Sequence, residues 1–278
     1  MRILLTGGSG FVGRQVHKAL KGDGHEVRLV LRPGREDRLL VPTDEADILH
    51  TDDLFAHSGD WWRETCREID TVVHAAWYVE PGKFQDASEN LACVSGTLAL
   101  AQGALAAGVG HFVGVGTCME YRLPSDRLEV TAPLAPSTLY AASKLALYQM
   151  LEPFFAPTET AFAWCRLFYL YGDGEYPARL VPYLRRQLES GETVKLSAGT
   201  QIRDFLDVAD AGRMIATVAE TGQTGPVNIC SGVPITIRQL AERIADEYGR
   251  RDLLEFGTAA IHPSDPASVV GVPNVARR

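Results

Sequence analysis

The alternation of apolar and polar residues along the chain predicts strands separated by helices. Apolar strands are predicted over Arg2–Leu5, Glu26–Leu31, Ala46–Leu49, Asp70–Ala76, Phe112–Gly116 and Ala161–Tyr169. After the first strand, the spacing of Val12, Val16, Ala19 and Leu20 places them on one face of a helix. Further helices are predicted over Asn90–Ala107, which is rich in alanine, and over Tyr140–Phe154. Strands with nearly unbroken apolar character, alternating with helices, are typical of a parallel sheet that is covered on both faces.

The pattern changes after Tyr171, where glycine and proline become more frequent between the elements. The remaining predicted elements are Arg179–Glu189, Thr193–Leu196, Val208–Glu220, Pro226–Cys230 and Ile237–Tyr248. We interpret this part as a smaller lobe at the carboxyl edge of the sheet, where open α/β sheets bind their ligands. The predicted fold is α/β, a doubly wound parallel Rossmann-type sheet (residues 1–170) with a smaller C-terminal substrate lobe (residues 171–278).

Composition narrows the classes of partner. The 278 residues are 46% hydrophobic, enough for a large core, and the net charge is −8. A negative chain without a basic run is a poor ligand for nucleic acid or an anionic membrane. The start of the chain lacks a secretory h-region and no apolar run could span a bilayer, so we expect a cytoplasmic protein. Five isolated cysteines without CxxC spacing indicate neither a metal site nor a disulfide framework.

A glycine-rich loop follows the first predicted strand. In TGGSGFVG, Gly7, Gly10 and Gly13 are spaced at every third residue and a helix begins behind them. Glycines allow a tight turn and a close approach of the backbone to a pyrophosphate, whose charge is met by the helix N-terminus. The alternative is a simple strand-to-helix turn. The flanking strand and helix favour a dinucleotide site.

Tyr140 and Lys144 are four residues apart on a predicted helix and therefore share one face. An ammonium group lowers the pKa of a nearby phenol, which then exchanges a proton with a hydroxyl or carbonyl group. Thr117 ends the fifth strand, where its hydroxyl could hold the reacting oxygen. The alternatives are a half-buried tyrosine with a solvated lysine, and a threonine that bonds its own backbone.

The end of the second strand bears on the choice of coenzyme. NAD-binding sheets place there an acid that binds the adenine ribose, but here Leu31 holds that position, and Arg32 and Arg35 follow. A guanidinium can grip a 2′-phosphate through two parallel hydrogen bonds. The pattern favours NADP(H), with NAD(H) possible. The alternative is that both arginines are solvated loop charges.

Seven segments together resemble the extended short-chain dehydrogenase/reductase family of nucleotide-sugar epimerases, dehydratases and ketoreductases. They are TGGSGFVG, DTVVHAA, GTCMEY, the YxxxK pair, RLFYLYG, RDFLDVAD and NICSG. The resemblance implies a catalytic triad of Thr117, Tyr140 and Lys144. It also implies dinucleotide contacts at Gly7, Gly10, Phe11, Val12, Gly13, Asp53, Ala75, Ala76, Tyr140 and Lys144. Arg32, proposed above from the end of the second strand, is a further candidate contact to the dinucleotide.

The same resemblance implies substrate contacts in the second half of the chain. Arg203 looks like the family's contact to the substrate diphosphate, unless it pairs with Asp204 or Asp207. Relatives usually carry asparagine where Tyr169 stands, so a contact to the sugar is expected to differ here. They often carry asparagine where Cys93 stands, so a local hydrogen bond is expected to differ as well. The runs GTQIRDFLDVADAG and LEFGTAAIHP are most similar to NDP-4-keto-6-deoxyhexose reductases, the group that includes CDP-abequose synthase.

The activity expected from this resemblance is reduction of the 4-keto group of an NDP-4-keto-6-deoxyhexose. The alternatives are an NDP-sugar 4-epimerase with retained NAD and a non-catalytic dinucleotide-sensing regulator. A 4,6-dehydratase is not expected, because resembling dehydratases carry Asp-Glu directly after the triad threonine and here Cys118 and Met119 follow. Glu120 comes one position later, and on a strand-like path one position reverses the direction of the side chain. Like many relatives, the protein is expected to be a homodimer through Asn90–Ala107 and Tyr140–Phe154.

Overall fold

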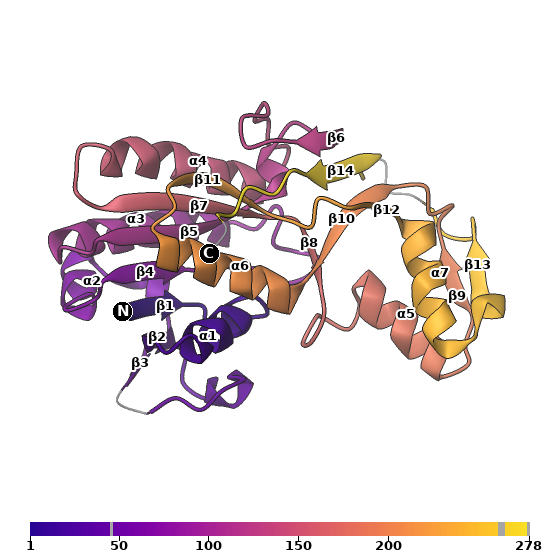
Figure 1. Cartoon of the computed structure of the whole chain (residues 1–278), viewed down its shortest axis with the longest axis horizontal. Helices are drawn as coiled ribbons and strands as arrows, with labels where there is room; N and C mark the ends of the chain where they lie inside the picture. Colours follow the sequence, from indigo (N-terminus) through magenta and orange to yellow (C-terminus); the bar gives the residue numbers. More distant parts are fainter. Residues whose placement is uncertain (45–46, 261–264, 277–278) are drawn as a thin grey trace.

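Seven parallel strands form the central sheet, in the order β11-β7-β5-β4-β1-β2-β3 (Figure 1). The computed structural model describes residues 1–44, 47–260 and 265–276. The strands are β1 (Arg2–Thr6), β2 (Glu26–Leu31), β3 (Ile48–His50), β4 (Thr71–His74), β5 (His111–Thr117), β7 (Ala161–Leu167) and β11 (Gly225–Ile229). The order reverses between β1 and β4, which makes the sheet doubly wound and confirms the predicted fold class.

Helices cover both faces of this sheet. One face carries α1 (Gly13–Gly22) and α6 (Val208–Thr221), and the other carries α2 (Gly59–Thr65), α3 (Glu89–Ala106) and α4 (Leu139–Phe155). Successive strand residues point to opposite faces, so Ile3 and Leu5 pack into the first core while Leu4 packs into the second. Both cores exclude water from the strands, as the apolar strand sequences require.

A second sheet and a small helical lobe lie beyond the carboxyl ends of the central strands (Figure 1). The second sheet contains β6 (Ser125–Leu128), β8 (Tyr169–Tyr171), β10 (Ile202–Asp207), β12 (Pro234–Thr236) and β14 (Ser268–Gly271). The lobe contains α5 (Leu180–Glu189), β9 (Val194–Leu196), α7 (Ile237–Tyr248) and β13 (Leu254–Phe256), which share their own core.

The predicted division into residues 1–170 and 171–278 does not match the division in space, because some later elements return to the central sheet. Both α6 and β11 were expected in the lobe, but β11 pairs in parallel with β7 and α6 packs against α1. Gly212 of α6 permits this close packing, because a Cβ there would lie 2.7 Å from Gln15. The connection from β7 to β11 therefore passes through the second sheet before returning to the central one.

Two predicted strands differ in their bounds. The third was expected over Ala46–Leu49 and is observed as β3, with Ala46 outside the described residues. The sixth was expected as one strand over Ala161–Tyr169, but it divides at Phe168: β7 pairs with β5 and β11, whereas β8 pairs with β10. The division occurs because the chain leaves one sheet and enters another at this point.

Two further findings concern the described part of the chain. No helix there is long and apolar enough to cross a membrane. The described side chains also contain no group of three or more His, Cys, Asp or Glu residues arranged to hold a metal ion. All five cysteines are free and buried.

Candidate active site

The glycine loop lies at the carboxyl end of β1 and leads directly into α1. Gly7 adopts a positive φ of 75°, and a Cβ there would lie 2.6 Å from the Ala76 backbone nitrogen. A Cβ on Gly13 would collide with the Gly7 carbonyl oxygen. Gly10 is exposed, and its N–H donates to the Gly7 carbonyl at 2.9 Å. This cradle fits a pyrophosphate at the N-terminus of α1, and the backbone of Ala75 and Ala76 lies beside it.

A buried polar chain supports the loop from below. The His74 ring bonds the Thr6 hydroxyl at 2.7 Å and the Thr97 hydroxyl at 2.9 Å, and so connects β1, β4 and α3. Thr97 in turn donates to the Cys93 carbonyl at 2.7 Å. Burial lowers the pKa of His74 to about 3, so the ring is neutral at physiological pH. Cys93 thus contributes its backbone carbonyl to this series of buried hydrogen bonds, at a position where relatives often have an asparagine side chain.

Tyr140 and Thr117 meet at the carboxyl end of β5. Thr117 ends that strand and Tyr140 lies in the first turn of α4, which Thr138 caps by accepting a hydrogen bond from the Ala141 N–H. The two side chains form a hydrogen bond. Burial is the largest of the effects that raise the pKa of Tyr140 above its ordinary value, while the Thr117 bond lowers it. The phenol is therefore protonated at neutral pH.

Lys144 is buried one turn after Tyr140. Its Nζ donates to the Val115 carbonyl at 2.7 Å and lies 3.7 Å from the centre of the Trp77 ring. Burial lowers the pKa of Lys144 to about 7, against an opposing effect of the Glu120 carboxylate. The expectation that the ammonium lowers the pKa of Tyr140 is not met, because the lysine bonds to β5 and the phenol is desolvated.

An aromatic segment, residues 77–88, covers Tyr140. The rings of Trp77 and Phe84 meet the Tyr140 ring edge-on, at centroid distances of 6.4 and 4.9 Å. Asn90 is fully buried and holds the segment, since it accepts from the Trp77 indole at 2.8 Å and donates to the Phe84 carbonyl at 2.7 Å. The segment therefore limits access of water to the phenol.

The residues after Thr117 form a short turn, η4 (Cys118–Glu120), that contains no exposed carboxylate. Cys118 is buried and Met119 is half-buried. Glu120 points inward, where its carboxylate accepts from Arg166 Nε at 2.7 Å. The turn thus agrees with the sequence argument that no acid pair follows the triad threonine.

Arg203 and Tyr169 lie together on the neighbouring strands β10 and β8. The Arg203 guanidinium lies 5.1 Å from the Tyr169 ring centre and pairs with Asp265 at 2.5 Å. Asp204 and Asp207, the partners considered from sequence, are occupied elsewhere: Asp204 accepts from the loop that begins at Ser231, and Asp207 caps α6. Arg203 is thus buried, and its counter-ion comes from a distant part of the chain.

Arg32 and Asp53 lie at the opposite end of the same edge. Arg32 is exposed directly after β2, and neither Arg32 nor Arg35 forms an ion pair with another described residue. Asp53 is exposed and caps the turn η3 (Leu54–Ala56) by accepting from the Phe55 N–H at 2.9 Å. Four strand spacings, about 19 Å, separate β3 from β5 in the sheet. The predicted coenzyme residues therefore extend along the edge from β5 to β3.

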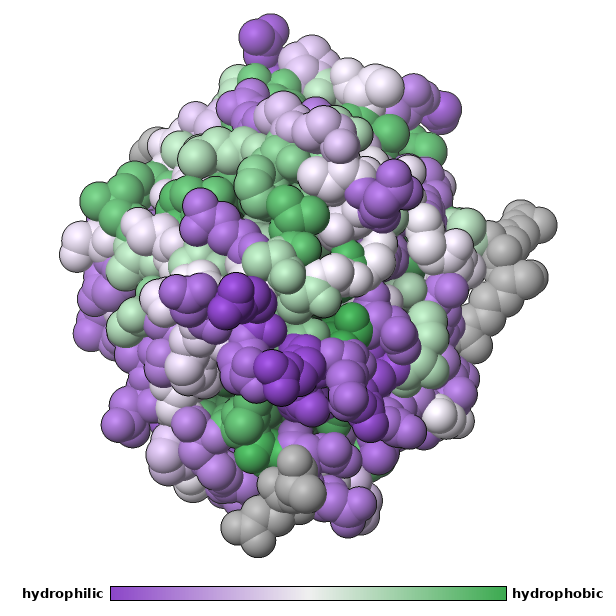
Figure 2. All heavy atoms as spheres, turned by 90° about the vertical axis from the view of Figure 1, so that its left-hand side faces the viewer, coloured by the Kyte–Doolittle hydropathy of each residue, from purple (hydrophilic) through white to green (hydrophobic). Residues whose placement is uncertain are grey.

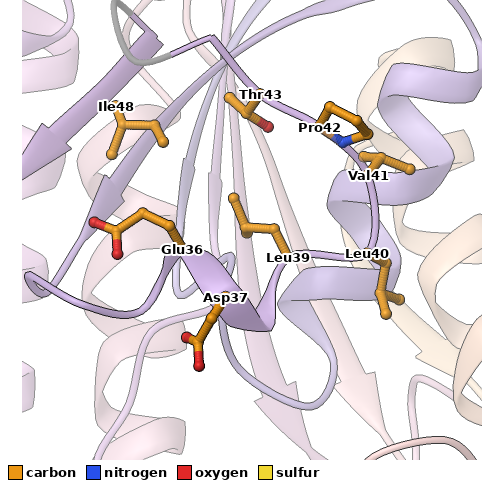
Figure 3. A pocket seen from close by; sticks show the side chains of 8 residues that line it. All are labelled: Glu36, Asp37, Leu39, Leu40, Val41, Pro42, Thr43 and Ile48. Carbon is orange, nitrogen blue, oxygen red and sulfur yellow. The ribbon is translucent and has the colours of Figure 1, made fainter.

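A hollow of about 370 Å³ lies beside this end of the sheet (Figure 3). Its lining consists of Glu36, Asp37, Leu39, Leu40, Val41, Pro42, Thr43 and Ile48. The lining follows β2 and includes part of β3, so it belongs to the edge remote from Tyr140. With two carboxylates and no basic group in its lining, the hollow does not match an anionic ligand.

Sequence reasoning missed three residues that shape the site. Trp77 directly follows the DTVVHAA motif, and an aromatic residue at that place was a usable signal. Glu120 was noticed only as an acid one position too late to reach the site. Asp265 is separated from Arg203 by 62 residues, and no local pattern connects the two.

Comparison with known proteins places these features in a family. The model of the NAD dependent epimerase/dehydratase family matches residues 3–230. The dTDP-6-deoxy-L-talose 4-dehydrogenase (NAD(+)) of Aggregatibacter actinomycetemcomitans is 24% identical, over 98% of this chain and 99% of that protein.

Two solved structures have a similar fold. The dTDP-glucose 4,6-dehydratase of Streptomyces venezuelae, crystallised with NAD bound, superposes with a TM-score of 0.82 and 25% identity, over 98% of this chain and 88% of that one. The UDP-N-acetylglucosamine 4-epimerase of Methanobrevibacter ruminantium M1 gives a TM-score of 0.84 at 22% identity, over 98% and 89% of the two chains.

Proposed function

Because the chain belongs to the NAD dependent epimerase/dehydratase family, we propose that it is an NAD(P)-dependent oxidoreductase that reduces the 4-keto group of a nucleotide-linked 4-keto-6-deoxyhexose. The observation that carries the proposal is the protonated Tyr140 phenol, bonded to Thr117 and one helical turn from Lys144. The full-length relative named as a 6-deoxy-L-talose 4-dehydrogenase supports this sugar class, since oxidation of a 4-hydroxyl group is the reverse of the proposed reduction.

Each member of the triad has a defined task in this reaction. A bound nicotinamide dinucleotide supplies the hydride. Tyr140 donates its proton to the carbonyl oxygen, and its raised pKa keeps that proton available. Thr117 orients the oxygen by its hydroxyl, and Lys144, one helical turn after Tyr140, would hold the nicotinamide ribose.

The glycine cradle and the N-terminus of α1 would hold the pyrophosphate, with Phe11 and Val12 directly before the helix. Asp53, Ala75 and Ala76 complete the coenzyme side. Arg32 favours the 2′-phosphate of NADPH, because it is exposed at the end of β2 without a described partner. The names of the relatives point to NAD instead, so the preference requires direct titration.

The substrate side is formed by β8 and β10. Arg203 would bind the diphosphate and exchange its contact with Asp265 for the phosphate oxygens. Tyr169 packs on the same guanidinium and faces the sugar in place of the family's asparagine. The lobe that carries α5 and α7 lies next to this strand pair (Figure 1) and would cover the nucleotide.

A homodimer through α3 and α4 forms part of the proposal. Leu91 on α3 and Met150 on α4 are 59% and 47% exposed, which is unusual for large apolar side chains. Figure 2 shows apolar residues gathered in the upper half of the face turned away from the lobe, at the height of α4 in Figure 1. Light scattering at micromolar concentration is expected to give twice the chain mass of 30.3 kDa. A monomeric mass would contradict the dimer.

The function is tested with a panel of CDP-, dTDP-, UDP- and GDP-linked 4-keto-6-deoxy sugars, each offered with NADPH or NADH while coenzyme absorbance is followed. One sugar is expected to consume coenzyme in a one-to-one ratio. Inversion of an NDP-sugar without coenzyme consumption would identify a 4-epimerase instead. Conversion of dTDP-glucose or CDP-glucose to a 4-keto-6-deoxy product would identify a dehydratase, and no turnover with tight coenzyme binding would favour the regulator.

A further inference from the structure

A buried ion pair lies directly behind the triad. The side chains of Glu120 and Arg166 are 0% and 1% exposed, and Arg166 Nε donates to the carboxylate at 2.7 Å. The Trp164 indole N–H donates to the same carboxylate, at 3.0 and 3.2 Å from its two oxygens. Burial of an ion pair has a large desolvation cost, so its presence beside a reaction site points to a role other than stability.

Glu120 holds the turn that carries Thr117. Its Oε1 accepts from the Thr117 backbone N–H at 2.9 Å, and the Thr117 hydroxyl accepts from the Met119 N–H at 3.3 Å. The two bonds form a reciprocal capping box. A rotation of the Glu120 carboxylate would therefore change the direction of the Thr117 hydroxyl, which bonds Tyr140.

The packing of β5 leaves space for this arrangement. A Cβ on Gly116 would collide with both the Glu120 carboxylate and the Trp164 indole nitrogen, and a Cβ on Gly114 would collide with the Trp164 ring. The alternating glycines of the VGVGT stretch thus allow the indole and the carboxylate to lie against the strand. The reason for these two glycines was not apparent from the sequence.

The same carboxylate acts on Lys144. The Lys144 Nζ lies 6.0 Å from the Trp164 ring centre, on the indole that bonds Glu120. Of the charges that affect the pKa of Lys144, Glu120 has the largest effect and raises it, against the lowering by burial. The other titratable or charged groups packed around this lysine are His74 on β4, Cys93 on α3, Tyr140 on α4 and, beyond Glu120, Arg166 on β7.

We propose that Glu120 is a positioning residue of the active site, whose carboxylate fixes the turn of Thr117 and supplies the buried negative charge that faces the Lys144 ammonium through the Trp164 indole. The inference rests on the proposed function for its catalytic consequence. Glu120 touches no reacting group, and Arg166 and Trp164 hold it in place. An acid that sequence reasoning set aside as misplaced thus controls two of the three triad members.

The test measures coenzyme affinity as a function of pH, by fluorescence titration with whichever of NADH and NADPH binds more tightly. Lys144 binds coenzyme in its protonated form, so wild-type affinity should weaken above pH about 7. Glu120→Gln retains an oxygen that accepts from Thr117 but removes the charge. The coenzyme affinity of this variant is expected to decline at a pH about one unit lower than in the wild type. On that part of the curve the variant therefore binds coenzyme about tenfold more weakly.

Glu220→Gln is the matched control, because Glu220 is also shielded from solvent and pairs with His25 at 2.9 Å, but at the amino end of the sheet. Its curve should coincide with the wild-type curve. A folded Glu120→Gln protein with an unshifted curve would overturn the proposal. If the unpaired Arg166 prevents folding, the double variant Glu120→Gln, Arg166→Met gives the same test without an uncompensated buried cation.

The binding curves are independent of the sugar substrate. A wild-type protein that binds coenzyme with the expected pH dependence but reduces none of the sugars would therefore refute the proposed function and leave the role of Glu120 standing.

Discussion

The two ends of the carboxyl edge of the central sheet differ in how their residues are held. At β5, Thr117, Tyr140 and Lys144 are positioned by buried contacts, including those to the Val115 carbonyl and the Glu120 carboxylate. At the β2 end, Arg32 is exposed and Asp53 caps its own turn. The side chains at β5 are fixed by packing within the protein, whereas the exposed side chains at β2 and β3 would be fixed only by contacts with a bound ligand.

The largest effect is expected at the buried end. Tyr140→Phe removes only the hydroxyl, so the fold should persist while turnover falls roughly 10²- to 10⁴-fold, as for loss of a general acid. Steady-state kinetics on the sugar that consumes coenzyme measure this loss. Tyr148→Phe is the control, since that hydroxyl on the same helix bonds only the exposed Glu152 in the described structure. Comparable turnover of the two variants would show that the phenol is not the proton donor.

The second effect concerns substrate binding on β10. Arg203→Ala removes the guanidinium proposed for the diphosphate and leaves Asp265 without its ion-pair partner. KM for the nucleotide-sugar should rise roughly 10- to 100-fold, the amount expected for hydrogen bonds to a charged group, with a smaller change in kcat. Arg213→Ala, on an exposed pair with Asp210, serves as the control. An unchanged KM would place the diphosphate elsewhere.

The exposed end should produce a smaller effect. NADPH is expected to bind about tenfold more tightly than NADH, and Arg32→Ala should abolish that difference, because one charge-assisted contact to the 2′-phosphate is worth about 1.4 kcal/mol or more. The control is Arg38→Ala, also exposed after β2. Equal affinities in the wild type, or NAD that co-purifies and survives dialysis, would favour a retained-NAD epimerase.

The smallest effect is a pH dependence of the free energy of unfolding, which comes from two buried histidines, His74 on β4 and His17 on α1. Burial depresses the pKa of His74 to about 3 and that of His17 to about 4, from 6.5. The unfolded chain takes up protons below pH 6.5 that the folded chain excludes, so stability falls with decreasing pH. Each histidine contributes about 1 kcal/mol per pH unit in that window. Urea unfolding should give a lower free energy of unfolding at pH 5.5 than at pH 7, and His74→Gln should make this difference smaller. The same difference in the wild type and the variant would contradict the prediction.

Sequence predicted most of the central sheet because its strands are apolar throughout and alternate with longer helical segments. The strands β10 and β14 escaped prediction, since they pair with each other across more than 60 residues of sequence. The same reason hid the Arg203–Asp265 pair. Tyr140 and Lys144 were predictable from a local spacing, but the direction of the lysine was not, because it depends on Val115 and Trp77 in other elements.

The central claim is that Tyr140 completes a net transfer of hydride to the carbonyl at sugar carbon 4. It is tested most directly with coenzyme deuterated at the transferred position and the NDP-4-keto-6-deoxyhexose found in the panel, followed by NMR of the product. The account predicts one deuterium at carbon 4 of the 6-deoxyhexose for every coenzyme oxidised, and almost none with Tyr140→Phe over the same time. Product without deuterium, or sugar inverted while the added coenzyme remains reduced, would contradict it.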